Sequence, residues 1–208
     1  MSLIIIDCGS GNLRSAAKAF EAAGARGVKV SNRAEDVLSA ERIVLPGQGS
    51  FTEVMKGLQA LPGMIEALKE SVQQKAKPFF GICVGMQLLA DKGAEHGGYD
   101  GLGFIGGEVN KLEIDASFKL PHMGWNNLAL KNAQHPLLKD MGTGAYVYFV
   151  HSYAFEPANR NDTLASCTYC VDFTAMVARG NIAGTQFHPE KSQKTGLQLI
   201  RNFLDWRP

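Results

Sequence analysis

The 208-residue sequence has few cysteines, no excess of charge of either sign and no long apolar run. Its 21 Lys and Arg nearly balance its 20 Asp and Glu, which leaves no basic surface of the kind that binds nucleic acid. Four cysteines are too few for a disulfide framework in a chain of this length. The first apolar run is broken at Asp7, too early for a signal peptide or a membrane span. We therefore expect a cytoplasmic protein that binds neither nucleic acid nor membranes.

Signatures of metal and cofactor sites are also missing. GSGNLR (9–14) begins like a dinucleotide-binding loop, but Arg14 stands where the third glycine is needed. CTYC (167–170) has no second cysteine pair, and residues i and i+3 of a strand face opposite sides. His96, His122 and His135 show no metal-ligand spacing. We expect neither a metal nor an organic cofactor.

The first half of the chain alternates short apolar runs with segments of helical periodicity. Strands are expected at 3–8, 28–31, 42–47 and 77–83, and helices at 12–23, 51–74 and 84–91. This order is typical of βαβ units, and it predicts a mostly parallel sheet with helices on both faces.

The second half is richer in short strands and turns. Strands at 146–155, 162–170, 173–179 and 182–187 predict an antiparallel extension of the sheet, followed by a last helix at 192–205. The expected architecture is therefore an α/β, flavodoxin-like fold with a mostly parallel central sheet and an antiparallel addition in the C-terminal half. Since no repeat or linker interrupts the chain, we expect residues 1–208 to form one domain.

The segment GICVG (81–85) places Cys83 where an expected strand turns into an expected helix. A nucleophile on such a tight turn is pushed above the sheet, and the turn needs small neighbours, which Gly81 and Gly85 provide. The backbone N–H of Val84 then points into the site as an oxyanion donor, and the start of the helix favours a thiolate. The alternative is an inert core cysteine, so a base is needed to decide.

The segment HPE (188–190) offers that base. Pro189 disfavours the α region for His188, so the stretch should be extended and His188 should share a face with Glu190. Glu190 can then hold one ring nitrogen while the other faces Cys83, as in a catalytic triad. Without a nucleophile nearby, the same letters would indicate a turn with a solvated carboxylate.

LPGQG (45–49) is a candidate for a second oxyanion donor. An apolar strand ends there in glycine-rich backbone, so the N–H groups of Gly47, Gln48 and Gly49 can turn toward a bound oxygen. Taken alone, this segment is an ordinary strand-to-helix turn.

Taken in order, these three segments resemble the class I (triad) glutamine amidotransferases, and the likeness spans nearly the whole chain. The motifs that carry it are DCGSGNLRS (7–15), GICVGMQLL (81–89), GLGFIGGEV (101–109), PHMGWN (121–126), YFVHSYAF (148–155) and GTQFHPEKS (184–192). The resemblance implies hydrolysis of the side-chain amide of L-glutamine, with Cys83 as nucleophile, His188 as general base and acid, and Glu190 as the group that orients His188.

The resemblance also implies how substrate and partner are bound. Gln87 is expected to contact the substrate and Glu95 to meet its α-amino group. Tyr148, His151, Ser152 and Tyr153 are expected to border its α-carboxylate. Ammonia is expected to pass to a (β/α)₈-barrel cyclase in a heterodimer. The expected interface residues are Asn12, Met123, Trp125 and Asn126, although Trp125 could equally be a core residue.

Two positions depart from the family pattern, and other functions stay open. Gln48 replaces a small apolar residue beside the expected oxyanion hole, and Val84 replaces a leucine. The chain could instead serve another class I amidotransferase, act as a peptidase of similar architecture, or be a regulatory subunit that has lost turnover. Glutamate release from glutamine in the presence of the cyclase would separate these alternatives.

Overall fold

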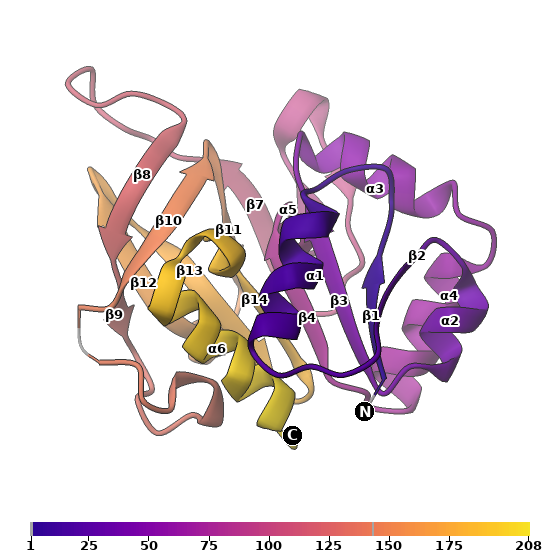
Figure 1. Cartoon of the computed structure of the whole chain (residues 1–208). Helices are drawn as coiled ribbons and strands as arrows, with labels where there is room; N and C mark the ends of the chain where they lie inside the picture. The colour runs from indigo at the N-terminus through magenta and orange to yellow at the C-terminus, as the bar shows by residue number, and fades with distance from the viewer. Residues whose placement is uncertain (1, 143) are drawn as a thin grey trace.

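The computed structural model describes residues 2–142 and 144–208, and its centre is an eight-stranded sheet (Figure 1). In spatial order the strands are β2 (Val28–Ser31), β1 (Leu3–Ile6), β3 (Arg42–Gly47), β4 (Phe79–Cys83), β14 (Ile182–Thr185), β13 (Val171–Arg179), β12 (Thr163–Tyr169) and β9 (Ala129–Leu130). The strands from β2 to β14 run parallel, and β13, β12 and β9 continue the sheet in antiparallel fashion. The predicted α/β architecture is therefore confirmed.

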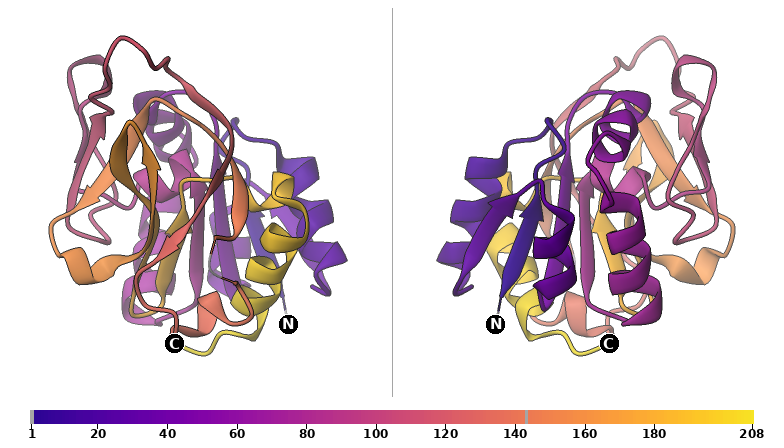
Figure 2. Two further views of the ribbon diagram at one scale, coloured as in Figure 1. Left: turned by 90° about the vertical axis from the view of Figure 1, so that its left-hand side faces the viewer. Right: turned by 90° about the vertical axis from the view of Figure 1, so that its right-hand side faces the viewer.

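Helices cover both faces of the parallel part of the sheet (Figures 1 and 2). On one face α1 (Leu13–Ala22) packs against α6 (Gln193–Asp205). The other face carries α2 (Ala34–Ser39), α3 (Phe51–Gln59), α4 (Met64–Leu68) and the π-helix η1 (Lys69–Gln74). Strands β1, β3 and β4 are buried along their whole length, as continuous apolar strands between two helical layers should be.

The helix after Cys83 is shorter than expected. We expected it at 84–91, but α5 spans only Val84–Gln87. The backbone carbonyl groups that follow accept hydrogen bonds from a distant segment. The N–H of Leu102 donates to the carbonyl oxygen of Leu88, and the N–H of Phe104 donates to the carbonyl oxygen of Leu89. The loop after β6 (Tyr99–Asp100) thus ends the helix by taking its carbonyls.

The strand expected at 146–155 is in fact two strands in two different sheets. β10 (Tyr146–His151) pairs with β8 (His122–Asn127), whereas β11 (Tyr153–Pro157) pairs with β7 (Gly107–Lys111). The sheet that contains β11 and β7 continues into β5 (Lys92–Gly93) and β6. The chain changes partners at Ser152, and this break turns the segment toward the carboxyl ends of β3 and β4.

Short 3₁₀ helices fill several connections. They are η2 (Glu95–Gly97), η3 (Pro136–Leu138), η4 (Arg160–Asp162) and η5 (Pro189–Lys191). Among the described residues, none of these elements or the longer helices has the length and apolar character needed to span a membrane.

Candidate active site

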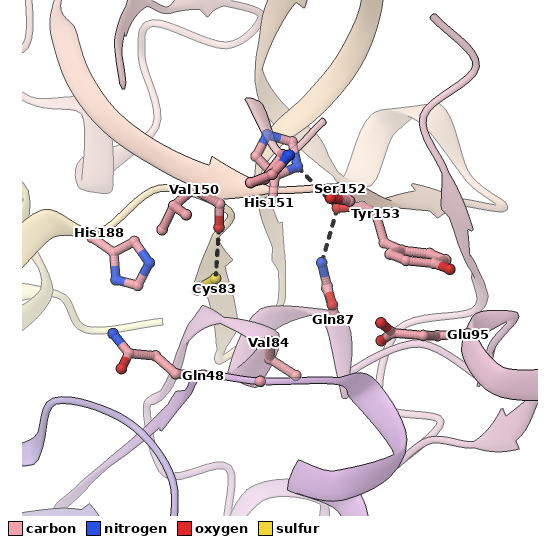
Figure 3. A pocket seen from close by; sticks show the side chains of 12 residues that line it. Gln48, Cys83, Val84, Gln87, Glu95, Val150, His151, Ser152, Tyr153 and His188 are labelled. Atoms are coloured by element: carbon pink, nitrogen blue, oxygen red, sulfur yellow. Dashed lines mark hydrogen bonds between the residues drawn. The ribbon is translucent and has the colours of Figure 1, made fainter. Parts of the chain in front are cut away.

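A cavity of about 420 Å³ opens where β3 and β4 end, beside the break between β10 and β11 (Figure 3). It brings together most of the predicted site residues, namely Gln48, Gly49, Cys83, Val84, Gln87, Glu95, His151, Ser152, Tyr153 and His188. These residues come from segments as far apart in the sequence as Gln48 and His188. The fold therefore gathers the expected nucleophile, base and substrate contacts around one space.

Cys83 lies on a tight strand-to-helix turn. Its backbone has φ +56° and ψ −112°, a conformation that residues other than glycine rarely adopt. A Cβ on Gly85 would lie 1.8 Å from the carbonyl oxygen of Leu45, and a Cβ on Gly81 would lie 2.4 Å from the carbonyl oxygen of Gly85. Both glycines are therefore required by close backbone approach, which is the reason given for them from the sequence.

His188 and Glu190 form a buried pair at η5. Nδ1 of His188 lies 2.8 Å from Oε1 of Glu190, and the two side chains are only 2% and 4% exposed. His188 has an extended backbone, as Pro189 requires. Nε2 of His188 is buried and makes no hydrogen bond of good geometry with any described residue. That nitrogen is free to exchange a proton inside the cavity.

The electrostatics of the pair favour a charged ring. Burial lowers the pKa of His188, but the side chains of Cys83 and Glu190 beside the ring outweigh burial and raise the pKa to about 9. His188 therefore carries a proton at neutral pH. An imidazolium next to a sulfur nucleophile is the charge arrangement that a cysteine hydrolase uses.

The glycine-rich loop after β3 packs directly on the elbow. Gly47 is the register partner of Cys83, and a Cβ on Gly47 would lie 2.8 Å from the backbone nitrogen of Gly85. The N–H of Gln48 donates to Oγ of Ser10 over 3.5 Å. Because Ser10 does not line the cavity, this N–H is directed away from it in this conformation. Sequence reasoning missed the contact, although Ser10 lies in a quoted motif.

Glu95 and Gln87 are both held by the protein. Oε2 of Glu95 accepts the backbone N–H of Phe51 over 2.8 Å, so the carboxylate caps the start of α3 while lining the cavity. Nε2 of Gln87 donates to the carbonyl oxygen of Tyr153 and to Oε1 of Gln186, each over 3.0 Å. Both hydrogens of the Gln87 side-chain amide therefore have protein partners. If Gln87 contacts the substrate, as predicted, it does so through its side-chain oxygen Oε1.

Gln186 is a site residue that sequence reasoning missed. It follows β14, is fully buried, and places Nε2 3.7 Å from the sulfur of Cys83. The available signal was its position two residues before His188 in an extended segment, which puts both on one face.

His151 belongs to a buried imidazole pair. Its Nε2 lies 3.1 Å from Nδ1 of His122, and its Nδ1 lies 2.9 Å from the carbonyl oxygen of Tyr153. Burial lowers the pKa of His122 to about 4. Burial also lowers the pKa of His151 to about 3, although the Tyr153 carbonyl opposes this. Both rings are therefore neutral at physiological pH.

Tyr148 does not line the cavity. Its ring packs edge-on against Trp125, with centroids 6.0 Å apart, since β8 and β10 are neighbours and these two residues are in register. Its backbone still serves the site, because the Tyr148 carbonyl oxygen accepts the N–H of His188 over 2.9 Å. Its side chain therefore does not lie where the prediction that Tyr148 borders the substrate carboxylate requires it.

Two of the predicted interface residues on β8 point outward, whereas Asn126 is half-buried on the other face of that strand. Met123 is 63% exposed and Trp125 is 44% exposed, so Trp125 is not the core residue that its sequence also allowed. Asn126 donates to the carbonyl oxygen of Thr168 over 3.0 Å. Asn12 lies apart from these residues, at the start of α1, where it caps the N–H of Ser15.

No group of His, Cys, Asp or Glu side chains in the described part of the chain is arranged to hold a metal ion. Cys167 is buried, and burial raises the pKa of its thiol to about 12, so that thiol stays protonated. Cys83 and His188, which both line the cavity, offer it a nucleophile and a proton carrier.

The cavity thus joins a cysteine to a histidine backed by a buried carboxylate, on an α/β sheet, and comparison with known proteins gives the family. The sequence model of the glutamine amidotransferase class-I family matches residues 4–206, so the chain belongs to that family. A crystal structure described as a glutamine amidotransferase shares the fold, with a TM-score of 0.74, 19% identity and coverage of 97% of both chains.

Two relatives narrow the family further. Imidazole glycerol phosphate synthase subunit HisH of Rhodospirillum rubrum is 53% identical over 214 residues, and the protein of that name from Cereibacter sphaeroides is 49% identical over 213. Both alignments cover 100% of this chain and of the relative. Within the class-I amidotransferases the chain is thus of the HisH type, the glutaminase subunit of imidazole glycerol phosphate synthase.

Proposed function

We propose that the whole chain acts as one glutaminase domain in which Cys83 attacks the side-chain amide carbon of L-glutamine. The N–H of Val84 and an N–H of the 47–49 loop stabilise the oxyanion. His188 gives its proton to the departing nitrogen, which leaves as ammonia and a thioester on Cys83. A water molecule, deprotonated by His188, then releases glutamate and restores the thiol. The observation that carries this proposal is that Cys83 and His188 share one cavity, with Glu190 buried behind the ring.

Substrate recognition follows from the same cavity. Glu95 presents a carboxylate for the α-ammonium group of glutamine, a charge-assisted contact. On the opposite wall, the break at Ser152 exposes backbone and hydroxyl groups for the α-carboxylate. Gln87 adds a carbonyl oxygen between them.

The partner that we propose is a (β/α)₈-barrel cyclase, with which the chain forms a heterodimer in the cytoplasm. The cyclase joins the ammonia to a ribulosylated formimino carboxamide ribonucleotide and yields imidazole glycerol phosphate and aminoimidazole carboxamide ribotide. The docking face that we assign includes Met123, Trp125 and Asn126 on β8, with Asn12 as a second contact. β8 pairs with β10, which itself contributes Val150 and His151 to the cavity. Docking on β8 therefore has a short structural route to the substrate.

We further propose that the chain alone turns over slowly. The N–H of Gln48 faces Ser10 and not the cavity, so this oxyanion donor is missing in the conformation described. Binding of the cyclase and its nucleotide ligand is expected to reorient the loop and raise glutaminase activity.

The test is glutamate release from L-glutamine by the purified chain, alone and mixed with its cyclase and nucleotide ligand. We expect slow release alone, a rise of at least tenfold in the complex, and no release by a Cys83→Ala complex. Absence of glutamate in the wild-type complex would support the regulatory-subunit alternative. High turnover by the chain alone would refute the coupling but not the hydrolysis.

A further inference from the structure

The sulfur of Cys83 has one hydrogen-bond donor and one hydrogen-bond acceptor of the protein within reach. Nε2 of Gln186 lies 3.7 Å away and can donate to sulfur. The carbonyl oxygen of Val150 lies 3.9 Å away and can accept from a thiol. A neutral thiol can use both neighbours, whereas a thiolate is repelled by the carbonyl oxygen and attracted by the amide N–H. Gln186 is thus the neighbour that distinguishes the reactive form.

The orientation of the Gln186 amide is set by its partners. Nε2 of Gln87 lies 3.0 Å from the carbonyl oxygen of Tyr153, which can only accept, so Gln87 must place its NH₂ group there. That NH₂ group also contacts the Gln186 side chain over 3.0 Å, and Gln186 must therefore present its oxygen to Gln87. Its own NH₂ group is then directed at the sulfur. Turning the amide over would bring two NH₂ groups together and leave an oxygen facing the nucleophile.

The chain of hydrogen bonds continues beyond Tyr153. The Tyr153 carbonyl oxygen also accepts from Nδ1 of His151, which leaves Nε2 of His151 to accept from Nδ1 of His122. The backbone N–H of Gln186 is bound to the carbonyl oxygen of Ala175 on β13. Gln186 is therefore fixed at both its backbone and its side chain, and a fixed donor stabilises charge without having to reorganise.

We propose that Gln186 is a further catalytic residue, which donates its amide N–H to the Cys83 sulfur and stabilises it as a thiolate. Gln87 acts through Gln186 as a positioning residue, because it determines which end of the amide faces the sulfur. This inference deepens the hydrolysis proposed above and rests on Cys83 being the nucleophile. In this proposal Gln186 stabilises the thiolate of Cys83, whereas His188 transfers protons.

The test is the rate at which iodoacetamide alkylates Cys83 in the full chain, followed by mass spectrometry of the Cys83 peptide from pH 5 to 10. Gln186→Met keeps the size of the side chain but removes the donor. We expect its alkylation at pH 7 to be about tenfold slower, with the midpoint of the pH profile raised by about one unit. Gln186→Glu should raise the midpoint further, because it adds a negative charge. Gln87→Met should raise it less than Gln186→Met does.

The matched control is Asn202→Leu. Asn202 is also a buried carboxamide, and its Nδ2 donates to the carbonyl oxygens of Leu137 and Lys139, away from the cavity. We expect Asn202→Leu to lower thermal stability while leaving the alkylation midpoint of Cys83 at the wild-type value. If the folded Gln186→Met variant keeps the wild-type midpoint, the proposal is wrong. If that variant does not fold, an unchanged midpoint in Gln87→Met overturns the proposal equally.

Alkylation uses no glutamine, so this readout separates the inference from the proposed function. Suppose that the wild-type complex releases no glutamate, but that Cys83 is alkylated more slowly in the Gln186 variants than in the wild type. This pair of results would refute the glutaminase proposal alone. A complex with normal glutaminase activity and unchanged alkylation in Gln186→Met would refute the present inference alone.

Discussion

Nδ1 of His188 and Oε1 of Glu190 lie 2.8 Å apart in a place that solvent hardly reaches. The contact fixes which ring nitrogen faces the cavity, because Nδ1 is committed to the carboxylate. It also helps to hold a proton on the ring, whose pKa is raised to about 9.

We expect Glu190→Gln to lower kcat for glutaminase activity about 100-fold in the complex, because the neutral amide no longer stabilises the imidazolium or enforces its orientation. The matched control is Glu66→Gln, an exposed carboxylate on α4, which should leave kcat unchanged. Equal kcat values for Glu190→Gln and the wild type would remove Glu190 from the mechanism.

The same substitution should change the pH dependence. The folded-state pKa of His188 is raised, so the stability gained from its protonation is fully present below about pH 6.5 and is lost as pH rises through about 9. Without the Glu190 charge the folded-state pKa of His188 should be lower, so this loss, which begins near pH 6.5 in both proteins, should be smaller and end at a lower pH. Thermal melts between pH 6 and 10 should therefore show a smaller alkaline decline in Glu190→Gln than in the wild type.

The elbow makes a steric prediction. A methyl group on Gly85 would lie 1.8 Å from the carbonyl oxygen of Leu45, which belongs to a buried strand and cannot move aside cheaply. We expect Gly85→Ala to lower the free energy of unfolding by about 3 kcal/mol or more, measured by urea denaturation. Gly142→Ala is the control, since a Cβ there has open space. Similar unfolding curves for the two variants would show that the turn relaxes easily.

Much of the central sheet could be predicted from local sequence. The strands at 28–31 and 42–47 have the bounds expected for them. The elbow at Cys83 could be predicted in part from local sequence: the steric need for Gly81 arises within five residues, from the carbonyl oxygen of Gly85, whereas the need for Gly85 arises from Leu45 on the neighbouring strand β3.

What could not be predicted depends on pairing between distant segments. The stretch 146–155 shows one continuous strand pattern, and its break at Ser152 exists only because β8 and β7 lie in different sheets. The contact of Gln186 with Cys83 likewise arises because β14 pairs with β4, with Thr185 opposite Ile82. No local pattern carries that information.

Glu95 gives a prediction about substrate affinity. Its carboxylate lines the cavity and accepts the N–H of Phe51 over 2.8 Å. In Glu95→Gln the amide oxygen can still accept that N–H, but the negative charge for the substrate ammonium is lost. We expect KM for glutamine to rise at least about tenfold with a smaller change in kcat. The free energy of unfolding should change by no more than about 1 kcal/mol. An unchanged KM would exclude Glu95 from substrate binding.

The exposed face of β8 gives a prediction about the partner. Trp125 is 44% exposed and packs edge-on against Tyr148. We expect Trp125→Ala to weaken binding of the cyclase by about tenfold or more in isothermal titration calorimetry, since large aromatic residues dominate interface energies. Val30→Ala is the control, because Val30 is a similarly exposed apolar residue on the edge strand β2. Equal dissociation constants for the wild type and Trp125→Ala would place the interface elsewhere.

The buried imidazole pair predicts how the protein responds to acid. Burial lowers the pKa of His122 to about 4, against about 6.5 in the unfolded chain. Between these values the unfolded chain binds a proton that the folded chain does not, so the free energy of unfolding must fall as pH falls. The slope from each such ring is up to about 1.4 kcal/mol per pH unit. His151, whose pKa is lowered further, adds a similar slope.

His122→Phe isolates one of these contributions. The phenyl ring keeps the stacking position of His122 between Phe149 and Tyr169 but cannot bind a proton. The variant loses the hydrogen bond to His151, so its stability at pH 7 should be lower, and the slope is therefore the quantity to compare. Urea denaturation from pH 6.5 to 4.5 should show a slope reduced by about 1.4 kcal/mol per pH unit. His96→Gln, which replaces an exposed ring, should retain the wild-type slope. If His122→Phe also retains it, His122 takes up a proton in the folded protein, and the buried chain from His122 to Tyr153 cannot have the direction assigned to it.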